Sequence, residues 1–157
     1  MPTSQAPSNA AEVVKVLLIS SQSEAQVSLR PIFDQSNWLL HGVSTCGEAL
    51  THLGENDTAV VICERDLPDG DWKLVLNRLE SLPMPPNLIV TSLLANAELW
   101  AEVLNLGGYD VLAQPFDAQE IYRVVFLAWD ARRRRVQASA KGNGKPETAR
   151  AKSRATA

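Results

Sequence analysis

Five short apolar runs alternate along the chain with segments whose apolar residues recur at helical spacing. The runs at 13–20, 58–63 and 88–92 are almost continuously apolar and rich in β-branched residues, which is typical of strands buried on both faces of a parallel sheet. The runs at 39–43 and 109–113 are shorter and weaker. Together they predict a five-stranded sheet.

The segments between these runs carry helix signals. Thr45 and Asp117 each precede a glutamate by three positions, which is the spacing of a capping box. Asp71 and Asn96 are candidate N-caps for two further helices. Pro31 lies within the first helical pattern and is expected to kink or shorten that helix.

Strand and helix patterns alternate five times over residues 13 to about 135. Short helical connections between buried strands require parallel pairing and right-handed crossovers. The fold class predicted for residues 13–135 is therefore α/β, with a doubly wound five-stranded parallel sheet in a three-layer α/β/α sandwich. In such a sheet ligands bind at the carboxyl ends of the strands.

Charge separates the body of the chain from its end. Residues 1–130 carry six Lys and Arg and 17 Asp and Glu, which gives a net charge of −11. Residues 131–157 carry nine Lys and Arg and one glutamate, which gives +8, so the overall net charge is −3. The polar residues 1–12 are expected to form a flexible leader. Residues 136–157, rich in Gly, Ala, Ser and cations, are expected to form a disordered basic tail.

Several protein classes are excluded by composition. The 157 residues suffice for one domain, and no apolar run approaches the roughly 18 to 20 residues that a membrane span requires. The start of the chain lacks the pattern of a secretory signal. Cys46 and Cys63 are too few for a disulfide framework or a four-ligand zinc site. We expect both to be reduced thiols in a cytoplasmic protein.

Four motifs at the expected strand ends indicate a family. They are KVLLISSQ at 15–22, VVICERDLPDGDW at 60–72, LIVTS at 88–92 and LNLGGYDVLAQPFD at 104–117. In this order and at this spacing the chain resembles the receiver domain of bacterial two-component response regulators over residues 13 to about 132. The resemblance implies a flavodoxin-like fold and a cis peptide bond before Pro115. A flavodoxin-type redox protein is discounted because no phosphate-binding loop follows the first strand.

The resemblance also implies a chemistry, namely transfer of a phosphoryl group from a kinase histidine to an aspartate at the end of the third strand. An acidic pair after the first strand holds Mg²⁺, which prefers hard oxygen ligands in octahedral geometry. A hydroxyl after the fourth strand and a lysine after the fifth stabilise the charge that develops on the phosphoryl oxygens.

This sequence departs from the family at four of these five positions. One carboxylate remains where the family has three and a lysine, so we expect Mg²⁺ binding to be weak or absent, no cofactor and no enzymatic activity. The matching positions are Ser20 and Ser21 for the acidic pair, Glu64 for the phosphoacceptor, Thr91 with its neighbour Ser92 for the hydroxyl, and Gln114, which precedes Pro115, for the lysine.

Glu64 has two interpretations that the sequence leaves about equal. It could mimic a phosphorylated aspartate, with Thr91 and Gln114 donating hydrogen bonds to its carboxylate. It could instead be a solvated strand-end carboxylate in a relic pocket, since one glutamate has less charge than a phosphate. Asp66 is a candidate displaced acceptor, although turn and capping chemistry is the more frequent role of such residues.

The resemblance further points to output surfaces. Val111 matches the position of an aromatic switch residue, but a β-branched aliphatic side chain has no ring to rotate. Tyr109 is an alternative switch residue, although an ordinary strand role is favoured for Val111. Trp100 and Trp129 are interface candidates that would flank the face made by the fourth helix, the fifth strand and the last helix, because aromatic residues dominate binding hot spots.

The basic residues at 132–154 leave three interpretations, which are a solvated tail, a nucleic-acid contact and attraction to an acidic surface. The solvated tail is favoured because no aromatic residues are interleaved. The sequence as a whole predicts an atypical receiver that acts as a phosphorylation-independent interaction module. Its expected partners are a histidine kinase or an output protein, with a homodimer left open. The alternatives are a phosphoacceptor receiver using Glu64 or Asp66, and a nucleic-acid-contacting regulator.

Overall fold

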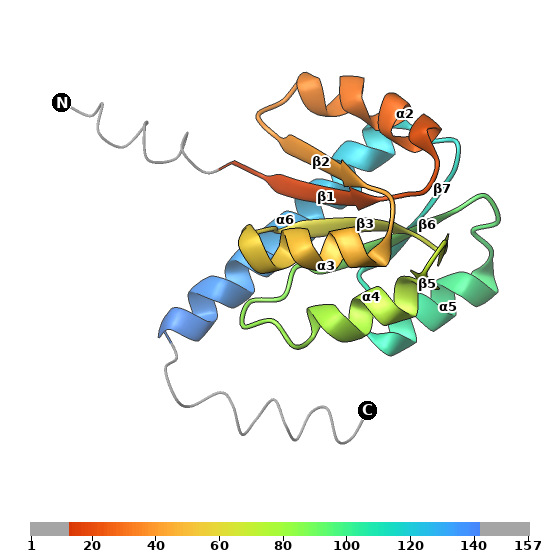
Figure 1. The fold of residues 1–157 in the computed structure, drawn as a ribbon. Helices are drawn as coiled ribbons and strands as arrows, with labels where there is room; N and C mark the ends of the chain where they lie inside the picture. Colours follow the sequence, from red (N-terminus) through yellow and green to blue (C-terminus); the bar gives the residue numbers. More distant parts are fainter. Residues whose placement is uncertain (1–12, 142–157) are drawn as a thin grey trace.

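The computed structural model describes residues 13–141. Five parallel strands form one sheet in the order β2-β1-β3-β6-β7, which confirms the predicted doubly wound, flavodoxin-like architecture (Figure 1). Both weak sequence runs, at 39–43 and 109–113, contain strands of this sheet. The strands are β1 (Lys15–Ile19), β2 (Leu39–Val43), β3 (Val60–Glu64), β6 (Asn87–Ser92) and β7 (Asp110–Ala113).

Helices cover both faces of the sheet. They are α2 (Ser23–Asp34), α3 (Cys46–Glu55), α4 (Trp72–Leu79), α5 (Ala97–Leu106) and α6 (Ala118–Lys141). Figure 1 shows α2 and α6 on one face and α3, α4 and α5 on the other. The predicted caps are confirmed, because the side chains of Thr45, Asp71, Asn96 and Asp117 accept hydrogen bonds from backbone N–H groups three residues on.

The helix α2 keeps its full 12 residues with Pro31 inside it, so the predicted shortening is wrong. Proline removes one hydrogen bond from a helix and clashes with the preceding turn. The apolar face of α2 offsets that cost, because Ala25, Leu29 and Phe33 are all buried against the sheet.

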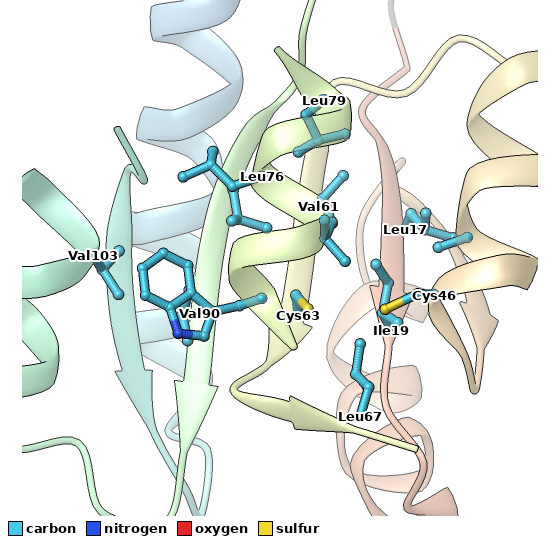
Figure 2. Close-up of a cluster of buried hydrophobic side chains, with 14 of the residues drawn as sticks. Leu17, Ile19, Cys46, Val61, Cys63, Leu67, Leu76, Leu79, Val90 and Val103 are labelled. Atoms are coloured by element: carbon cyan, nitrogen blue, oxygen red, sulfur yellow. The ribbon is translucent and has the colours of Figure 1, made fainter. Parts of the chain in front are cut away.

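Two hydrophobic clusters fill the spaces on either side of the sheet. One lies under α2 and α6, and the other lies under α3, α4 and α5. Every residue of β3 is buried, as expected of a central strand in a parallel sheet. Figure 2 shows the second cluster, in which Cys46, Cys63 and Leu67 lie near the carboxyl ends of the strands. The buried core thus reaches directly beneath the site described below.

A short hairpin that the sequence analysis did not predict follows β3. The strands β4 (Asp66–Leu67) and β5 (Gly70–Asp71) pair antiparallel across the turn at Pro68 and Asp69. The carboxylate of Asp69 accepts hydrogen bonds from the backbone N–H groups of Cys46 (2.8 Å) and Gly47 (3.0 Å). This contact fixes the loop after β3 to the first turn of α3.

The helix α6 runs through Lys141, so residues 136–141, which were predicted to belong to the tail, are helical. Arginines of the 132–135 run hold the helix to the domain. Arg132 donates to Asp57 Oδ1 (3.1 Å) and to the carbonyl of Met84 (3.0 Å). Arg135 donates to Asn87 Oδ1 (3.0 Å) and to the carbonyl of Pro85 (2.9 Å).

The predicted leader at 1–12 and the remainder of the predicted tail, 142–157, lie outside the described residues. Within residues 13–141, none of the helices is both long enough and apolar enough to cross a bilayer.

Candidate functional site

A buried carboxylate lies at the end of the central strand. Glu64 is the last residue of β3 and is only 9% exposed. The hydroxyl of Ser20, just after β1, donates a 2.8 Å hydrogen bond to Glu64 Oε2. The same hydroxyl accepts a bond from the backbone N–H of Gln22 (3.1 Å), and the carbonyl of Gln22, at 3.2 Å, is a second and longer-range acceptor for its proton. Ser20 is itself 1% exposed.

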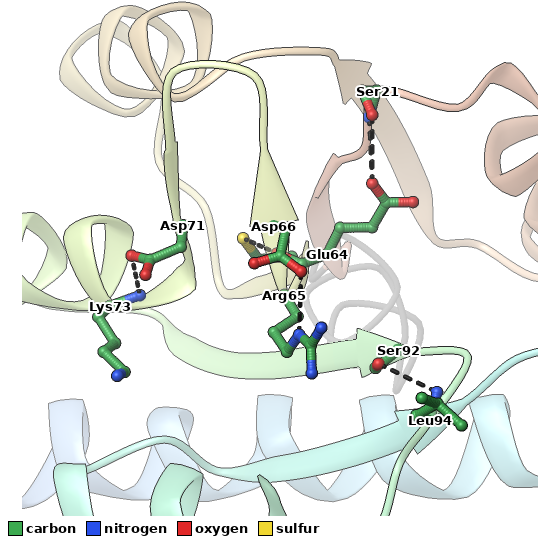
Figure 3. A network of polar contacts seen from close by, with 9 residues as sticks. Ser21, Glu64, Arg65, Asp66, Asp71, Lys73, Ser92 and Leu94 are labelled. Atoms are coloured by element: carbon green, nitrogen blue, oxygen red, sulfur yellow. Dashed lines mark hydrogen bonds and ion pairs between the residues drawn. The ribbon is translucent and has the colours of Figure 1, made fainter.

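Ser21 makes longer contacts with the other carboxylate oxygen. Its backbone N–H lies 3.4 Å and its hydroxyl 3.5 Å from Glu64 Oε1. Figure 3 shows the Glu64 side chain extended toward Ser21 and away from Ser92. Glu64 therefore turns toward β1, and Ser20 and Ser21 supply its hydrogen-bond donors.

Thr91 and Gln114 form a separate pair. Gln114 Nε2 donates to Thr91 Oγ1 at 3.2 Å. Within the described part of the chain neither side chain donates to Glu64, so the hydrogen bonds expected of a phosphoaspartate mimic are not formed. The physical reason is that donors on the β1 side, of which Ser20 is buried, already satisfy the carboxylate.

Ser92 and Pro115 shape the loops beside this pair. The hydroxyl of Ser92 accepts the backbone N–H of Leu94 (3.1 Å), and its carbonyl accepts the N–H of Gln114 (3.2 Å). The Gln114–Pro115 peptide bond is cis, as the resemblance implied. Ser92 is thus engaged in holding the loop after β6 rather than in the Glu64 cluster.

The aspartates that follow β3 point away from Glu64. Asp66 is exposed and pairs with its neighbour Arg65 at 3.0 Å, as Figure 3 shows. Asp71 caps α4, and Asp69 caps α3. The backbone N–H groups of Cys46 and Gly47 hold the pKa of Asp69 below its usual value.

The donor set fits Mg²⁺ poorly. The ion takes near-octahedral oxygen ligands and is usually bound through one or two carboxylates that are available to it, together with waters and phosphate oxygens. Here a single carboxylate and two hydroxyls meet, and the carboxylate oxygens already accept hydrogen bonds. Among residues 13–141 there is no cluster of three or more His, Cys, Asp or Glu side chains able to hold a metal ion.

The remaining predicted residues lie in different places. Val111 is buried in the core on the face covered by α3, α4 and α5. Trp100 is half exposed on α5, and its ring nitrogen donates to Asp110 Oδ1 at the β7 edge (3.2 Å). Trp129 instead lines a cavity beside β1 and the β2 edge. The two tryptophans therefore do not flank one surface as predicted, because α6 presents Trp129 to the opposite edge of the sheet.

Neither cysteine is an activated nucleophile. Burial is the main factor that raises the pKa of Cys46 to about 11 and the pKa of Cys63 well above its ordinary value. A raised pKa keeps the thiol protonated and unreactive at neutral pH. Both cysteines are free and buried within the core.

Sequence reasoning missed two long-range contacts, of which only the first lies near the carboxyl ends of the strands. Asp69 caps a helix that begins 23 residues before it, and the 132–135 arginines bind loops about 50 residues away in sequence. Neither contact has a local sequence pattern. The available signals were the presence of Asp69 in the turn and of Arg132 to Arg135 after the last helical pattern.

No protein-family model matches the chain, and no curated protein does. Among solved structures the fold is similar to the signal receiver domain of an HD domain-containing protein from Pseudomonas fluorescens Pf-5, with 23% identity, a TM-score of 0.72, and coverage of 79% of this chain and 92% of that one. It is also similar to the signal receiver domain of a putative Luxo repressor protein from Vibrio parahaemolyticus (17% identity, TM-score 0.75, coverage 81% and 98%).

A third similar structure is the beryllofluoride-activated NtrC4 receiver domain dimer (19% identity, TM-score 0.70, coverage 75% and 98%). The chain therefore has the fold of receiver domains.

Proposed function

We propose that this chain is an atypical receiver domain of two-component signalling that acts as a protein-interaction module without accepting a phosphoryl group. The receiver fold and the order of the four sequence motifs support the signalling role. The absence of phosphoryl transfer is proposed from the hydrogen bond between Ser20 and Glu64. The position that matches the phosphoacceptor holds a glutamate whose carboxylate is already hydrogen-bonded.

The electrostatics of the pocket oppose phosphoryl transfer. A phosphoryl group brought to Glu64 meets a negative charge, and Ser20 and Ser21 supply no carboxylates to hold a neutralising Mg²⁺. The extra methylene of glutamate also displaces the nucleophilic oxygen by roughly an ångström, and errors of that size cost about 10²-fold in rate.

The position of the family's lysine is equally unsuited to the reaction. Gln114 is uncharged, and its amide is engaged by the hydroxyl of Thr91. A neutral amide stabilises developing negative charge less than an ammonium group does. The two groups that would respond to a phosphoryl group therefore bind each other.

A pocket held in this way favours one signalling state. Thr91 is tied to Gln114, and Val111 is a buried aliphatic residue with no ring to exchange between two positions. The partner is then a kinase or output protein that recognises the fixed surface of the domain, in the cytoplasm where such partners act. The half-exposed Trp100 supports a docking role for the α5 face.

Phosphorylation tests the proposal directly. We expect the full chain to show no gain of one phosphoryl group by intact mass after incubation with acetyl phosphate and Mg²⁺, and no thermal shift with beryllofluoride and Mg²⁺. The matched control is a variant that combines S20D, S21D, E64D and Q114K. It restores the family's residues and shows that the assay detects a working pocket.

A mass gain in the unaltered chain that is abolished by Glu64→Ala or by Asp66→Asn would overturn the proposal and would identify the acceptor. The docked arginines Arg132 and Arg135 weaken the nucleic-acid alternative, because their guanidinium groups are already bound to the domain. Salt-sensitive DNA binding that is lost when the chain is cut after residue 141 would restore that alternative.

A further inference from the structure

A cavity of about 550 Å³ lies at the amino edge of the sheet, at the opposite end of the strands from Glu64. The first residues of β1 and β2, the segment before β3 and the second half of α6 form its walls. Its volume falls within the range of roughly 300 to 1,000 Å³ that small-molecule sites occupy. The lining side chains that matter here are Lys15, Leu39, Asp57, Trp129, Arg132 and Arg133.

Positive charge gathers in this cavity although the body of the protein is acidic. Lys15, Arg132 and Arg133 line it, and Asp57 is its one acidic lining residue. Asp57 is engaged by Arg132, and Asp130 behind the wall engages Arg133. Lys15 makes no ion pair within residues 13–141, so the cavity keeps a positive charge that the surrounding acids do not neutralise.

Two guanidinium N–H groups in the wall lack acceptors. The Nε atoms of Arg132 and Arg133 are buried and have no hydrogen-bond partner among the described residues. A buried donor without an acceptor is energetically unfavourable.

The apolar walls favour a ligand with a planar body. The guanidinium group of Arg133 lies over the Trp129 ring, with its carbon 5.0 Å from the ring centroid, and Asp130 binds one of its edge nitrogens, Nη2. Leu39 is 58% exposed beside the same cavity, and an apolar ring packed against it would lose contact with water.

We propose that this cavity binds a small nucleotide-type ligand, with its phosphate at Lys15, Arg132 and Arg133 and its ring against Leu39 and Trp129. The ends of the chain are unsuited to this place. Residues 142–157 carry four cations and one acid, and residues 1–12 carry one acid. Neither segment supplies the concentrated negative charge that the cavity favours. The inference does not depend on the proposed signalling function.

The test is calorimetric titration of the full chain with each of the four ribonucleoside 5′-monophosphates, with adenosine and inorganic phosphate as separate arms. We expect at least one nucleotide to bind more tightly than either adenosine or phosphate. Lys15→Gln should weaken that binding about tenfold, the effect of one charge-assisted hydrogen bond. Trp129→Leu should weaken it as well.

The matched control is Arg123→Gln, which removes an exposed cation from the same helix outside the cavity and should leave binding unchanged. Circular dichroism melts confirm that each variant is folded. No binding of any nucleotide, or binding that Lys15→Gln and Trp129→Leu leave unchanged, would overturn the proposal. Equal binding of nucleotide and inorganic phosphate would overturn the role of the ring.

Discussion

The hydroxyl of Ser20 lies 2.8 Å from Glu64 Oε2, and both residues are buried. The Glu64 carboxylate is thus stabilised by a neutral hydroxyl donor and, within residues 13–141, not by a cation. The same contact turns Glu64 away from Thr91, whose hydroxyl accepts from Gln114 instead. The site is therefore divided into two hydrogen-bonded halves.

Removal of the Ser20 hydroxyl should destabilise the fold. The Ser20→Ala variant leaves a buried carboxylate oxygen without its short hydrogen bond, and we expect a loss of about 1–3 kcal/mol in the free energy of unfolding, measured by urea denaturation. Ser21→Ala is the matched control. The exposed Ser21 hydroxyl lies 3.5 Å from Glu64, so its loss should cost less than about 0.5 kcal/mol. Equal losses in the two variants would contradict this account.

Two glycine substitutions should act in opposite directions. Gly107 ends α5 with φ of 111°, a conformation that disfavours a Cβ atom. Gly107→Ala should lower stability by about 1 kcal/mol.

Gly54 lies within α3 with no atom near the position of an added Cβ, so Gly54→Ala should raise stability by about 0.5–1 kcal/mol. Thermal and urea melts measure both, and a stable Gly107→Ala variant would refute the strain argument.

The contribution of Asp69 should depend on pH. Its backbone donors lower its pKa in the folded state, so its charged form stabilises the fold above the unfolded pKa of about 3.9. That stabilisation is lost as pH falls through the lower folded pKa. Asp69→Asn should therefore be less stable than the unaltered chain at neutral pH, and the difference should shrink below about pH 4. Urea melts from pH 7 to pH 3 measure it, and a difference that grows on acidification would reverse the assigned sign.

Loss of the Arg132 contacts should loosen the end of α6. This side chain is only 12% exposed and binds both Asp57 and the carbonyl of Met84. In Arg132→Ala we expect amide hydrogen exchange to accelerate about tenfold in the last turns of α6 and in the loop before β6. Arg134→Ala is the control, because Arg134 is 74% exposed and, among residues 13–141, binds only Asp130. Unchanged exchange in Arg132→Ala would show that the arginine does not hold the helix.

The order of elements could be predicted from sequence because the signals are local. The continuous apolar run that ends at Cys63 predicts a doubly buried strand, and the structure buries every residue of β3. Thr45 and Asp117 indicate helix starts through contacts three residues away. The position of Glu64 at a strand end follows from the same local pattern.

The contacts within the site could not be predicted in this way. The direction of the Glu64 side chain depends on a serine 44 residues earlier, and either neighbouring strand offered a donor. The apolar residues around Trp129 indicate a helix, but they do not indicate which edge of the sheet the side chain faces. That direction depends on how α6 packs on the sheet. The sequence favours a solvated tail for the arginine run. The carbonyl and amide groups that bind these arginines are distant in the sequence, so no local pattern indicates them.

The contacts of Arg132 and Arg135 lie in the second half of α6, so its last turns alone extend beyond the point of attachment. At 1.5 Å per residue the six residues 136–141 extend about 9 Å beyond Arg135, and Arg132 and Arg135 bind the loop before β6. A small tilt at that point is magnified at the far end. A fluorescent dye at Ala140 would therefore register rearrangements at the base of the sheet as changes in energy transfer.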